Sequence, residues 1–186
     1  DKSWHWYYVT SILIHTGLRF GELSALETTD IDTKNLTIRI SKTYDSINDI
    51  VTTPKTDNSK RTIHIQPDLL LELKKCLLWR NEMMLANNIR SCLLIPNIKT
   101  GEHMQIAGYE KYLRVTSEKL LGRHVTPHML RHTHASLLAA NGMTPDEIAR
   151  RLGHSKSTIT SKIYIHVTQK VIENDNRKLD QIKLFS

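Results

Sequence analysis

The chain has 186 residues, 39% of them hydrophobic and 24% charged, so it is long enough and apolar enough to bury a domain-sized core. Lys and Arg outnumber Asp and Glu by 26 to 19, and the net charge of +7 favours an anionic partner, nucleic acid before a membrane surface. The sequence shows neither a signal peptide nor a long apolar run, and Cys76 and Cys92 have no metal-ligand spacing. Export and membrane insertion are therefore not expected, and a reduced, cytoplasmic setting is.

The first predicted elements surround an arginine. Residues 4–16 are predicted to form an apolar helix that ends at Gly17. Gly17 and Gly21 then bracket Arg19 in a tight turn, and Glu22 follows the arginine by three residues. Glu22 either forms a surface ion pair of little energetic value, or holds a partly buried Arg19 in a pose that grips a phosphate.

A small antiparallel sheet is predicted next, because the apolar residues change to a period of two. The three predicted strands of this meander are 36–40, 50–53 and 61–65. The second connecting turn is basic and carries Lys55 directly after Pro54. At the end of this turn Lys60 and Arg61 are candidates for contact with backbone phosphates of DNA.

The remainder of the chain is predicted to be mainly helical. The predicted elements are a helix at about 67–88, an extended piece at 91–97, a helix at about 105–121 and a charged helix at about 168–183. The inward residues of the helix at 105–121 are predicted to be Tyr109, Tyr112, Leu113, Leu120 and Leu121. The fold class is therefore α+β, mainly α-helical with a small three-stranded antiparallel sheet.

The segment 126–166 concentrates the residues that carry chemistry. Thr126 followed by Pro127 predicts a helix start, and Gly142 suits the end of that helix. A second helix is predicted from the capping box of Thr144 and Glu147 up to Gly153. His128 and Arg131 lie three residues apart in the first of these helices, near its positive N-terminal end, which favours an anion.

A single tyrosine, Tyr164, follows His154 by ten residues. A tyrosine hydroxyl has a pKa near ~10, so it attacks nothing at neutral pH unless neighbouring groups take its proton or stabilise its anion. The two histidines and the arginine of this segment are able to do both. A lone half-buried tyrosine without such a role is the ordinary alternative.

Two other interpretations of the segment are open. Residues 144–160 resemble a helix-turn-helix, with Ala149 where the helices cross and Gly153 in the turn, as in a DNA-binding regulator. His128 and His132 are four residues apart on a helix, as zinc ligands can be, with His124 and His134 nearby. The zinc interpretation lacks the glutamate of the HExxH motif, and Arg131 would repel a cation, so structural hydrogen bonds are expected for His132 and His134.

Six residues in sequence order resemble the tyrosine recombinase (phage integrase) family, closest to the integrases of phages and conjugative transposons. They are Arg19 in TGLRFGEL, Lys55 in TPKT, His128 and Arg131 in PHMLRHTHA, His154 in LGHS and Tyr164 in IYIHV. The resemblance spans residues 10–170 and implies the catalytic-domain fold of that family. It also accounts for the helix-turn-helix appearance, because the family's LGHS turn precedes the segment that carries the tyrosine.

The resemblance implies a role for each residue. Arg19 and Arg131 would bind the non-bridging oxygens of the scissile phosphate, with Glu22 supporting Arg19. Tyr164 would be the nucleophile and Lys55 the acid for the leaving 5′-hydroxyl. His128 would take the proton of the tyrosine, and His154 would donate a hydrogen bond to the phosphate. The reaction would need no metal, cofactor or ATP.

The resemblance further implies a DNA integrase that recombines two duplexes as a homotetramer, with topoisomerase-like relaxation as the nearest alternative reaction. Residues 1–186 are expected to be one catalytic domain, with 168–186 a C-terminal helix that is exchanged between protomers. The core-binding and arm-binding domains of such proteins are expected to be missing from this chain, which begins at Asp1. Binding to double-stranded DNA should then be weak and strongly dependent on salt.

Overall fold

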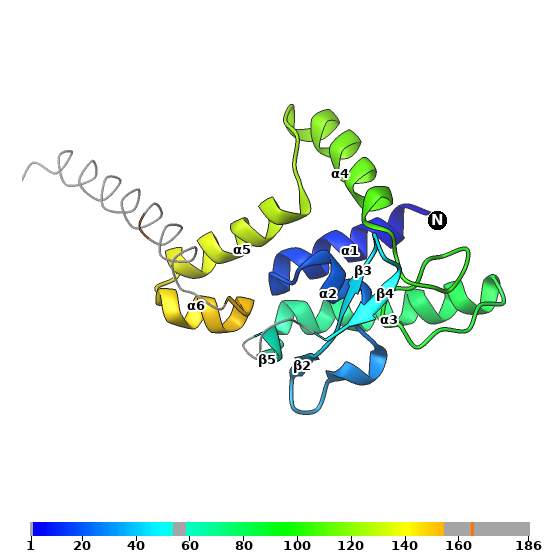
Figure 1. Ribbon diagram of the computed structural model, residues 1–186, viewed down its shortest axis with the longest axis horizontal. Helices are drawn as coiled ribbons and strands as arrows, with labels where there is room; N and C mark the ends of the chain where they lie inside the picture. The colour runs from blue at the N-terminus through cyan, green and yellow to red at the C-terminus, as the bar shows by residue number, and fades with distance from the viewer. Residues whose placement is uncertain (1, 54–58, 155–164, 166–186) are drawn as a thin grey trace, which may run out of the picture.

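A computed structural model describes residues 2–53, 59–154 and 165 of the chain. Its α-helices are α1 (Lys2–Thr16), α2 (Phe20–Ser24), α3 (Pro67–Ala86), α4 (Ile106–Leu121), α5 (Pro127–Ala140) and α6 (Pro145–Leu152). Short strands and a 3-10 turn lie between α2 and α3: η1 (Thr28–Asp30), β1 (Ile31–Asp32), β2 (Thr37–Ile40), β3 (Thr43–Asp45), β4 (Ile50–Thr52) and β5 (Arg61–His64). The predicted α+β class, mainly helical with a small antiparallel sheet, is confirmed (Figure 1).

The helices begin and end where local signals predict. Thr126 accepts a hydrogen bond from the backbone of Met129, and Thr144 and Glu147 form the predicted capping box. Gly17 and Gly153 adopt positive φ angles of 66° and 70° at the ends of α1 and α6. Side chains with a Cβ disfavour this region, so these glycines end both helices beside the site described below.

The sheet has a different third strand from the predicted meander. β2 pairs directly with β5, with Ile38 opposite Ile63, and its other neighbour is β1, whereas the meander would have placed residues 50–53 between these two strands. β4 pairs with β3 in a separate ribbon, Tyr44 opposite Val51, so the segment 50–53 is not the middle strand. The reason is a local turn in which Asp45 accepts hydrogen bonds from the backbone amides that follow it, and such a short loop closes at low entropic cost.

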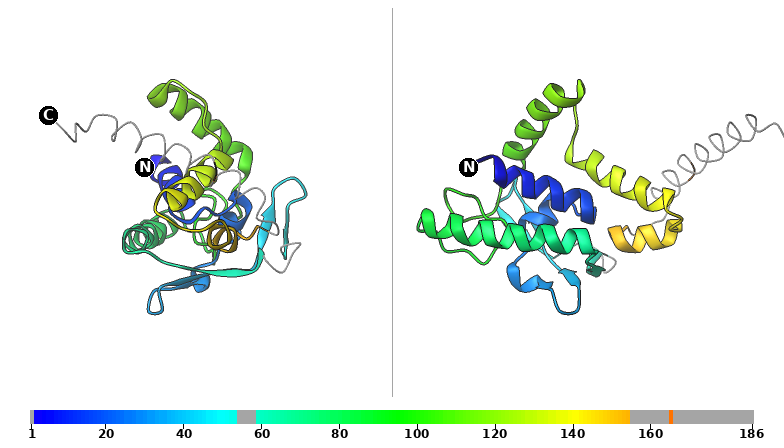
Figure 2. Two further views of the ribbon diagram at one scale, coloured as in Figure 1. Left: turned by 90° about the vertical axis from the view of Figure 1, so that its left-hand side faces the viewer. Right: turned by 180° about the vertical axis from the view of Figure 1, so that it is seen from behind.

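The core lies between the sheet and α1, α2 and α3. Its fully buried side chains include Ile12, Leu23, Ile38, Leu69 and Leu94. α1 packs against both α3 and α5, so it joins the main core to a smaller apolar cluster between α5 and α6. α1 therefore fixes the position of the last helices relative to the turn that carries Arg19 (Figure 2).

The apolar side chains of α4 that pack on the core lie in the part of the helix up to Leu113. Tyr109 and Leu113 are buried as predicted, but Leu120 and Leu121 are exposed by 72% and 60%, so the prediction that they face inward is wrong. The second half of α4 extends away from the body before the chain turns back into α5 (Figures 1 and 2). Helical spacing alone does not tell where a neighbouring element stops covering a helix.

In the described part of the chain, no helix combines the length and the apolar character needed to cross a bilayer.

Candidate active site: an arginine cluster at the end of the last described helix

Arg19 occupies the turn between α1 and α2 and is held by Glu22. Its backbone amide donates to Oε2 of Glu22 at 2.9 Å, and its Nη1 donates to Oε1 at 3.0 Å. The Glu22 side chain is 3% exposed, whereas that of Arg19 is 40% exposed. The expected contact between these residues is therefore present. The buried carboxylate of Glu22 holds the partly exposed guanidinium of Arg19 in one orientation.

Arg61, at the start of β5, binds the same carboxylate from the other side. Its Nη1 and Nη2 donate to the two oxygens of Glu22 at 3.0 and 2.9 Å, and its Nε donates to the carbonyl oxygen of Arg151 at 2.7 Å. Burial alone would raise the pKa of Glu22, but the hydrogen bonds and charges of Arg61 and Arg19 lower it below its usual value. The carboxylate therefore stays ionised at neutral pH.

The burial of Arg61 bears on its predicted contact with DNA phosphate. Its side chain is only 6% exposed, whereas Lys60 beside it is exposed. The geometry of Arg61 favours support of Glu22 over contact with an external phosphate. Sequence spacing gave both basic residues equal weight because it carries no information on which of them points inward.

Arg131, in the second turn of α5, is buried without an ion pair among the residues that the structure describes. Its Nη1 donates to the carbonyl oxygen of Gly17 and its Nη2 to that of Leu152, both at 2.6 Å. Burial, and then the positive charge of Arg19, lower its pKa to about 9, which leaves it protonated at neutral pH. A buried cation whose hydrogen bonds go only to carbonyl groups has no counter-ion, and a bound anion would supply one.

His154 follows Gly153 just beyond the end of α6, close to these charges. Partial burial, followed by the charges of Arg131, Arg19 and Arg61, lowers its pKa to about 4. The imidazole is therefore neutral at pH 7, and its neutral ring has one N–H that can donate to an oxyanion. His128 lies in the first turn of α5 and is exposed.

The structure thus brings Arg19, Glu22, Arg131 and His154 together, as the sequence predicted for one site. Lys55 and Tyr164 lie outside the described residues, and so does most of the second helix of the predicted helix-turn-helix. We use the name arginine cluster for Arg19, Arg61, Arg131 and Arg151.

Besides Arg61, the residues Arg151 and His134 belong to this region although the sequence did not place them in the site. The Nε of Arg151 donates to Nε2 of His134 at 3.2 Å, and Nδ1 of His134 lies 2.9 Å from the carbonyl oxygen of Ile14. The structural hydrogen bonds predicted for His132 and His134 are therefore confirmed for His134, whereas His132 is exposed and its side chain has no hydrogen bond among the described residues. The sequence signal for Arg151 is only its place in the last turn of α6, where a basic residue is common.

The arginine cluster is suited to a phosphate. Glu22 is the one carboxylate that hydrogen-bonds to these guanidinium groups in the described part of the chain, so positive charge is in excess. Planar guanidinium groups match the oxygens of a phosphate, and their charge favours a transition state that is more anionic than the ground state. Among the described residues, no group of three or more His, Cys, Asp or Glu side chains is arranged to hold a metal ion.

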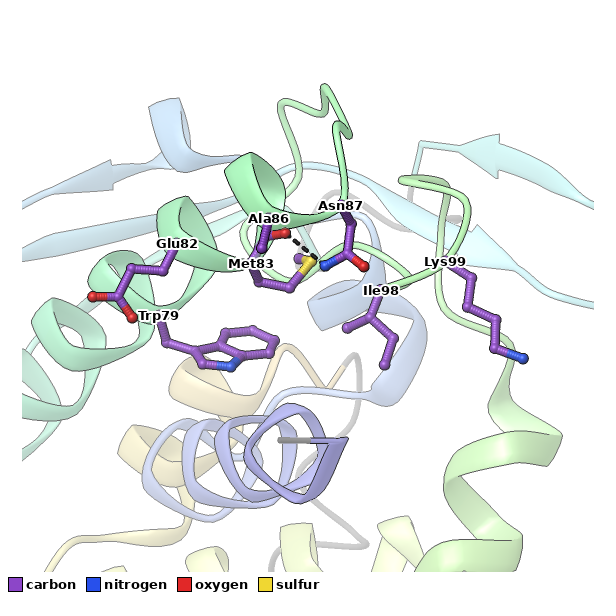
Figure 3. A pocket seen from close by; sticks show the side chains of 7 residues that line it. All are labelled: Trp79, Glu82, Met83, Ala86, Asn87, Ile98 and Lys99. Carbon is purple, nitrogen blue, oxygen red and sulfur yellow. Dashed lines mark hydrogen bonds between the residues drawn. The ribbon is translucent and has the colours of Figure 1, made fainter.

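A surface pocket at the far end of α3 has a different character. Trp79, Met83, Ile98 and Lys99 are among its lining residues, and Asn87 donates to the carbonyl oxygen of Met83 at 2.8 Å beside it (Figure 3). Its one cationic lining residue, Lys99, is balanced by Glu82. The C-terminal end of α3, which lines this pocket, lies at the opposite end of that helix from α6 (Figures 1 and 2). The pocket lining lacks the excess of positive charge that marks the arginine cluster.

Comparison with known proteins assigns the chain to a family. Residues 2–170 match the sequence model of the phage integrase family. The chain is 35% identical over 175 residues to the integrase of Staphylococcus phage L54a, covering 90% of this chain and 49% of that protein. It is 30% identical over 190 residues to a XerC-like tyrosine recombinase of Caldanaerobacter subterraneus subsp. tengcongensis, covering 90% of this chain and 47% of that protein. The chain belongs to the phage integrase family, as its motifs predicted.

Solved structures share the fold. The integrase of transposon Tn1549, in complex with transposon right end DNA, matches with a TM-score of 0.74 and 24% identity, covering 97% of this chain and 60% of that one. The XerA recombinase matches with a TM-score of 0.71 and 23% identity, covering 98% and 60%. The predicted tyrosine recombinase catalytic-domain fold is therefore confirmed. The chain spans about half the length of the relatives that it matches in sequence.

Proposed function

We propose that this chain is the catalytic domain, with a C-terminal helix at 168–186, of a site-specific DNA recombinase that integrates and excises a mobile element. Membership of the phage integrase family and the likeness to an integrase and a recombinase support this proposal. The observation that carries it is the position of Arg131, a buried cation with no carboxylate partner among the described residues, beside Arg19 and His154.

The first proposed step is binding of the scissile phosphate. Arg19 and Arg131 bind its non-bridging oxygens, and His154 donates a hydrogen bond from its neutral ring. These groups stabilise the additional negative charge of the pentacoordinate transition state. Arg61 keeps Glu22 ionised and in place, so that Glu22 holds Arg19 in its orientation.

The covalent step is proposed from the motif residues. The oxygen of Tyr164 forms a bond to phosphorus, while the bond between phosphorus and the 5′ oxygen breaks. His128 accepts the proton of the tyrosine, and Lys55 donates a proton to the leaving 5′ oxygen. The product is a 3′-phosphotyrosyl link with a free 5′-hydroxyl, and attack by a 5′-hydroxyl from a second duplex reverses the step without ATP.

Double-stranded DNA is the proposed partner, since the Tn1549 integrase was solved with transposon DNA. Lys60 is proposed to contact the DNA backbone, because it is exposed next to the buried Arg61. Recombination of two duplexes requires four cleavages, so a homotetramer on DNA is proposed. Exchange of the helix at 168–186 between protomers would couple their active sites.

The test is formation of a covalent protein–DNA adduct. The chain is incubated in EDTA with a nicked duplex that contains the recombination site of its element, and a denaturing gel is run beside Tyr164→Phe. We expect a shifted band that needs Tyr164 and forms in EDTA. Binding without any adduct, for the complete protein as well as for this chain, would favour the helix-turn-helix regulator instead.

A further inference from the structure

Two consecutive carbonyl groups at the end of α6 hold two members of the arginine cluster. The carbonyl oxygen of Arg151 accepts from Nε of Arg61 at 2.7 Å, and that of Leu152 accepts from Nη2 of Arg131 at 2.6 Å. The last carbonyl groups of a helix have no partner within the helix and carry partial negative charge. The position of the last turn of α6 therefore sets the position of both guanidinium groups.

The side chain of Arg151 ties this turn to two other elements directly and to a third through His134. Its Nε donates to His134 on α5, and its Nη1 lies 3.4 Å from the carbonyl oxygen of His64 on β5. His134 is buried and contacts the carbonyl oxygen of Ile14 on α1. These contacts fix the position of α6 relative to α1, the helix that leads into the turn carrying Arg19.

The chemistry of His134 fixes the direction of these hydrogen bonds. A carbonyl oxygen only accepts, so Nδ1 of His134 carries the proton and donates to Ile14. Nε2 then has a free lone pair, which accepts from Arg151. Burial, followed by the charge of Arg151, lowers the pKa of His134 to about 4, so the ring keeps this neutral form at pH 7.

The surroundings of Arg151 do not favour an arginine on grounds of stability alone. Its Nη2 is buried and has no hydrogen-bond partner in the described part of the chain. Burial and the charge of Arg61 both lower its pKa, which means that its environment disfavours the charged form. An unsatisfied buried donor beside a like charge costs free energy, and an apolar residue of similar size would avoid that cost.

We propose that Arg151 and His134 are positioning residues, which fix the last turn of α6 so that its carbonyl groups hold Arg61 and Arg131 beside Arg19. The proposal rests on the function proposed above. Neither residue needs to touch DNA in this role. If this proposal is right, replacing Arg151 lowers activity without lowering stability.

The first test replaces Arg151 with methionine, which keeps an unbranched, flexible side chain and removes the charged guanidinium group. We expect Arg151→Met to unfold at the same or a higher denaturant concentration than the wild type. Adduct formation at saturating DNA should fall on the order of 10- to 100-fold, because small misplacement of catalytic groups is costly. Arg150→Met is the matched control, since Arg150 is exposed on the same helix turn, and it should change neither quantity.

Two readouts distinguish failure of this proposal from failure of the proposed function. In the ¹⁵N–¹H spectrum of the free protein, the Nε–Hε signal of Arg61 should shift in Arg151→Met and stay in place in Arg150→Met. An unchanged Arg61 signal, or an adduct rate in Arg151→Met equal to that of the wild type, would overturn the positioning role. Absence of any adduct for the wild type would count against the function alone, and the Arg61 signal would still decide the role of Arg151.

A double variant tests whether the two residues act as a unit. His134→Phe removes the acceptor for Arg151, so the loss of rate in His134→Phe/Arg151→Met should be about that of the larger single loss. If the rate losses of the two single variants multiply in the double variant, the residues act independently, and the proposal that they act as a unit is wrong.

Discussion

The buried carboxylate of Glu22 holds the guanidinium groups of two arginines in place. It accepts two hydrogen bonds from Arg61 and two from Arg19, yet only Arg19 keeps an exposed guanidinium. Removing its charge leaves Arg61 buried without a counter-ion, which is more costly than losing a surface ion pair. The carboxylate thus contributes both to stability and to the orientation of Arg19.

We predict that Glu22→Gln lowers the free energy of unfolding by on the order of 3 kcal/mol, because it removes one partner of a buried ion pair. Denaturant unfolding measures the change. Glu118→Gln, which alters an exposed glutamate on α4, serves as the control and should change stability by less than about 0.5 kcal/mol. Equal stability of Glu22→Gln and the wild type would show that the contacts of Glu22 contribute nothing to the fold.

At the scale of elements, the site depends on the junction of α1, α5 and α6. Gly17 ends α1 with a φ of 66°, and its carbonyl oxygen holds Arg131. A Cβ on Gly17 would lie 2.6 Å from Cδ2 of His134 and 2.6 Å from Cδ2 of Leu152. The glycine therefore permits both the turn and the close approach of α5 and α6.

Gly17→Ala should destabilise the protein by more than Gly122→Ala. Both glycines have positive φ, which costs an alanine about 1 kcal/mol, but a Cβ on Gly122 meets no atom within 4 Å. The difference between the two variants in thermal unfolding isolates the steric part of the effect. Equal losses would mean that α5 and α6 move apart without cost.

The elements were predictable where the signal was local. The capping residues Thr126, Thr144 and Glu147 and the terminal Gly153 define α5 and α6 through contacts within a few residues. Strand pairing was not predictable in detail, since the turn at residues 45–49 pairs β4 with β3 and leaves β2 to pair with β1 and β5.

The sequence predicted which residues belong to the site better than it predicted which contacts those residues make. Arg19, Arg131 and His154 were expected together and are found together, whereas Arg61 was expected outside and lies inside. The part played by Arg151 depends on backbone carbonyl groups of α6 and on a histidine of α5. No pattern in the sequence shows that those groups meet.

At the scale of the whole molecule, burial keeps several histidines neutral. The pKa values of His5, His134 and His154 are each lowered from 6.5 to about 4, with burial as the largest cause. The unfolded chain takes up these protons as the pH falls below about 6.5, whereas the folded chain resists until about pH 4. The unfolded state therefore binds more protons in this window, and stability falls as the pH is lowered.

We predict that the free energy of unfolding decreases between pH 7 and pH 5, with each well-buried histidine adding a slope of up to about 1.4 kcal/mol per pH unit. His154 adds less because it is more exposed. Thermal unfolding across this range measures the effect, and His5→Phe should reduce the slope. A profile that is flat from pH 7 to pH 5 would contradict the burial of these rings as neutral groups.

Arg19 and Arg131 are proposed to neutralise the charge of a scissile phosphate. Arg19→Ala tests this role best, because Arg19 is partly exposed and its removal leaves the pair of Glu22 with Arg61 intact. Adduct formation is measured on a normal duplex and on one whose scissile phosphate is replaced by an uncharged methylphosphonate.

On the normal duplex Arg19→Ala should slow adduct formation by on the order of 10²- to 10³-fold relative to the wild type. On the methylphosphonate the loss should be much smaller, because there is less negative charge for the arginine to stabilise. Equal losses on the two substrates would rule out this role, since Arg19 would then act through something other than the charge of the phosphate.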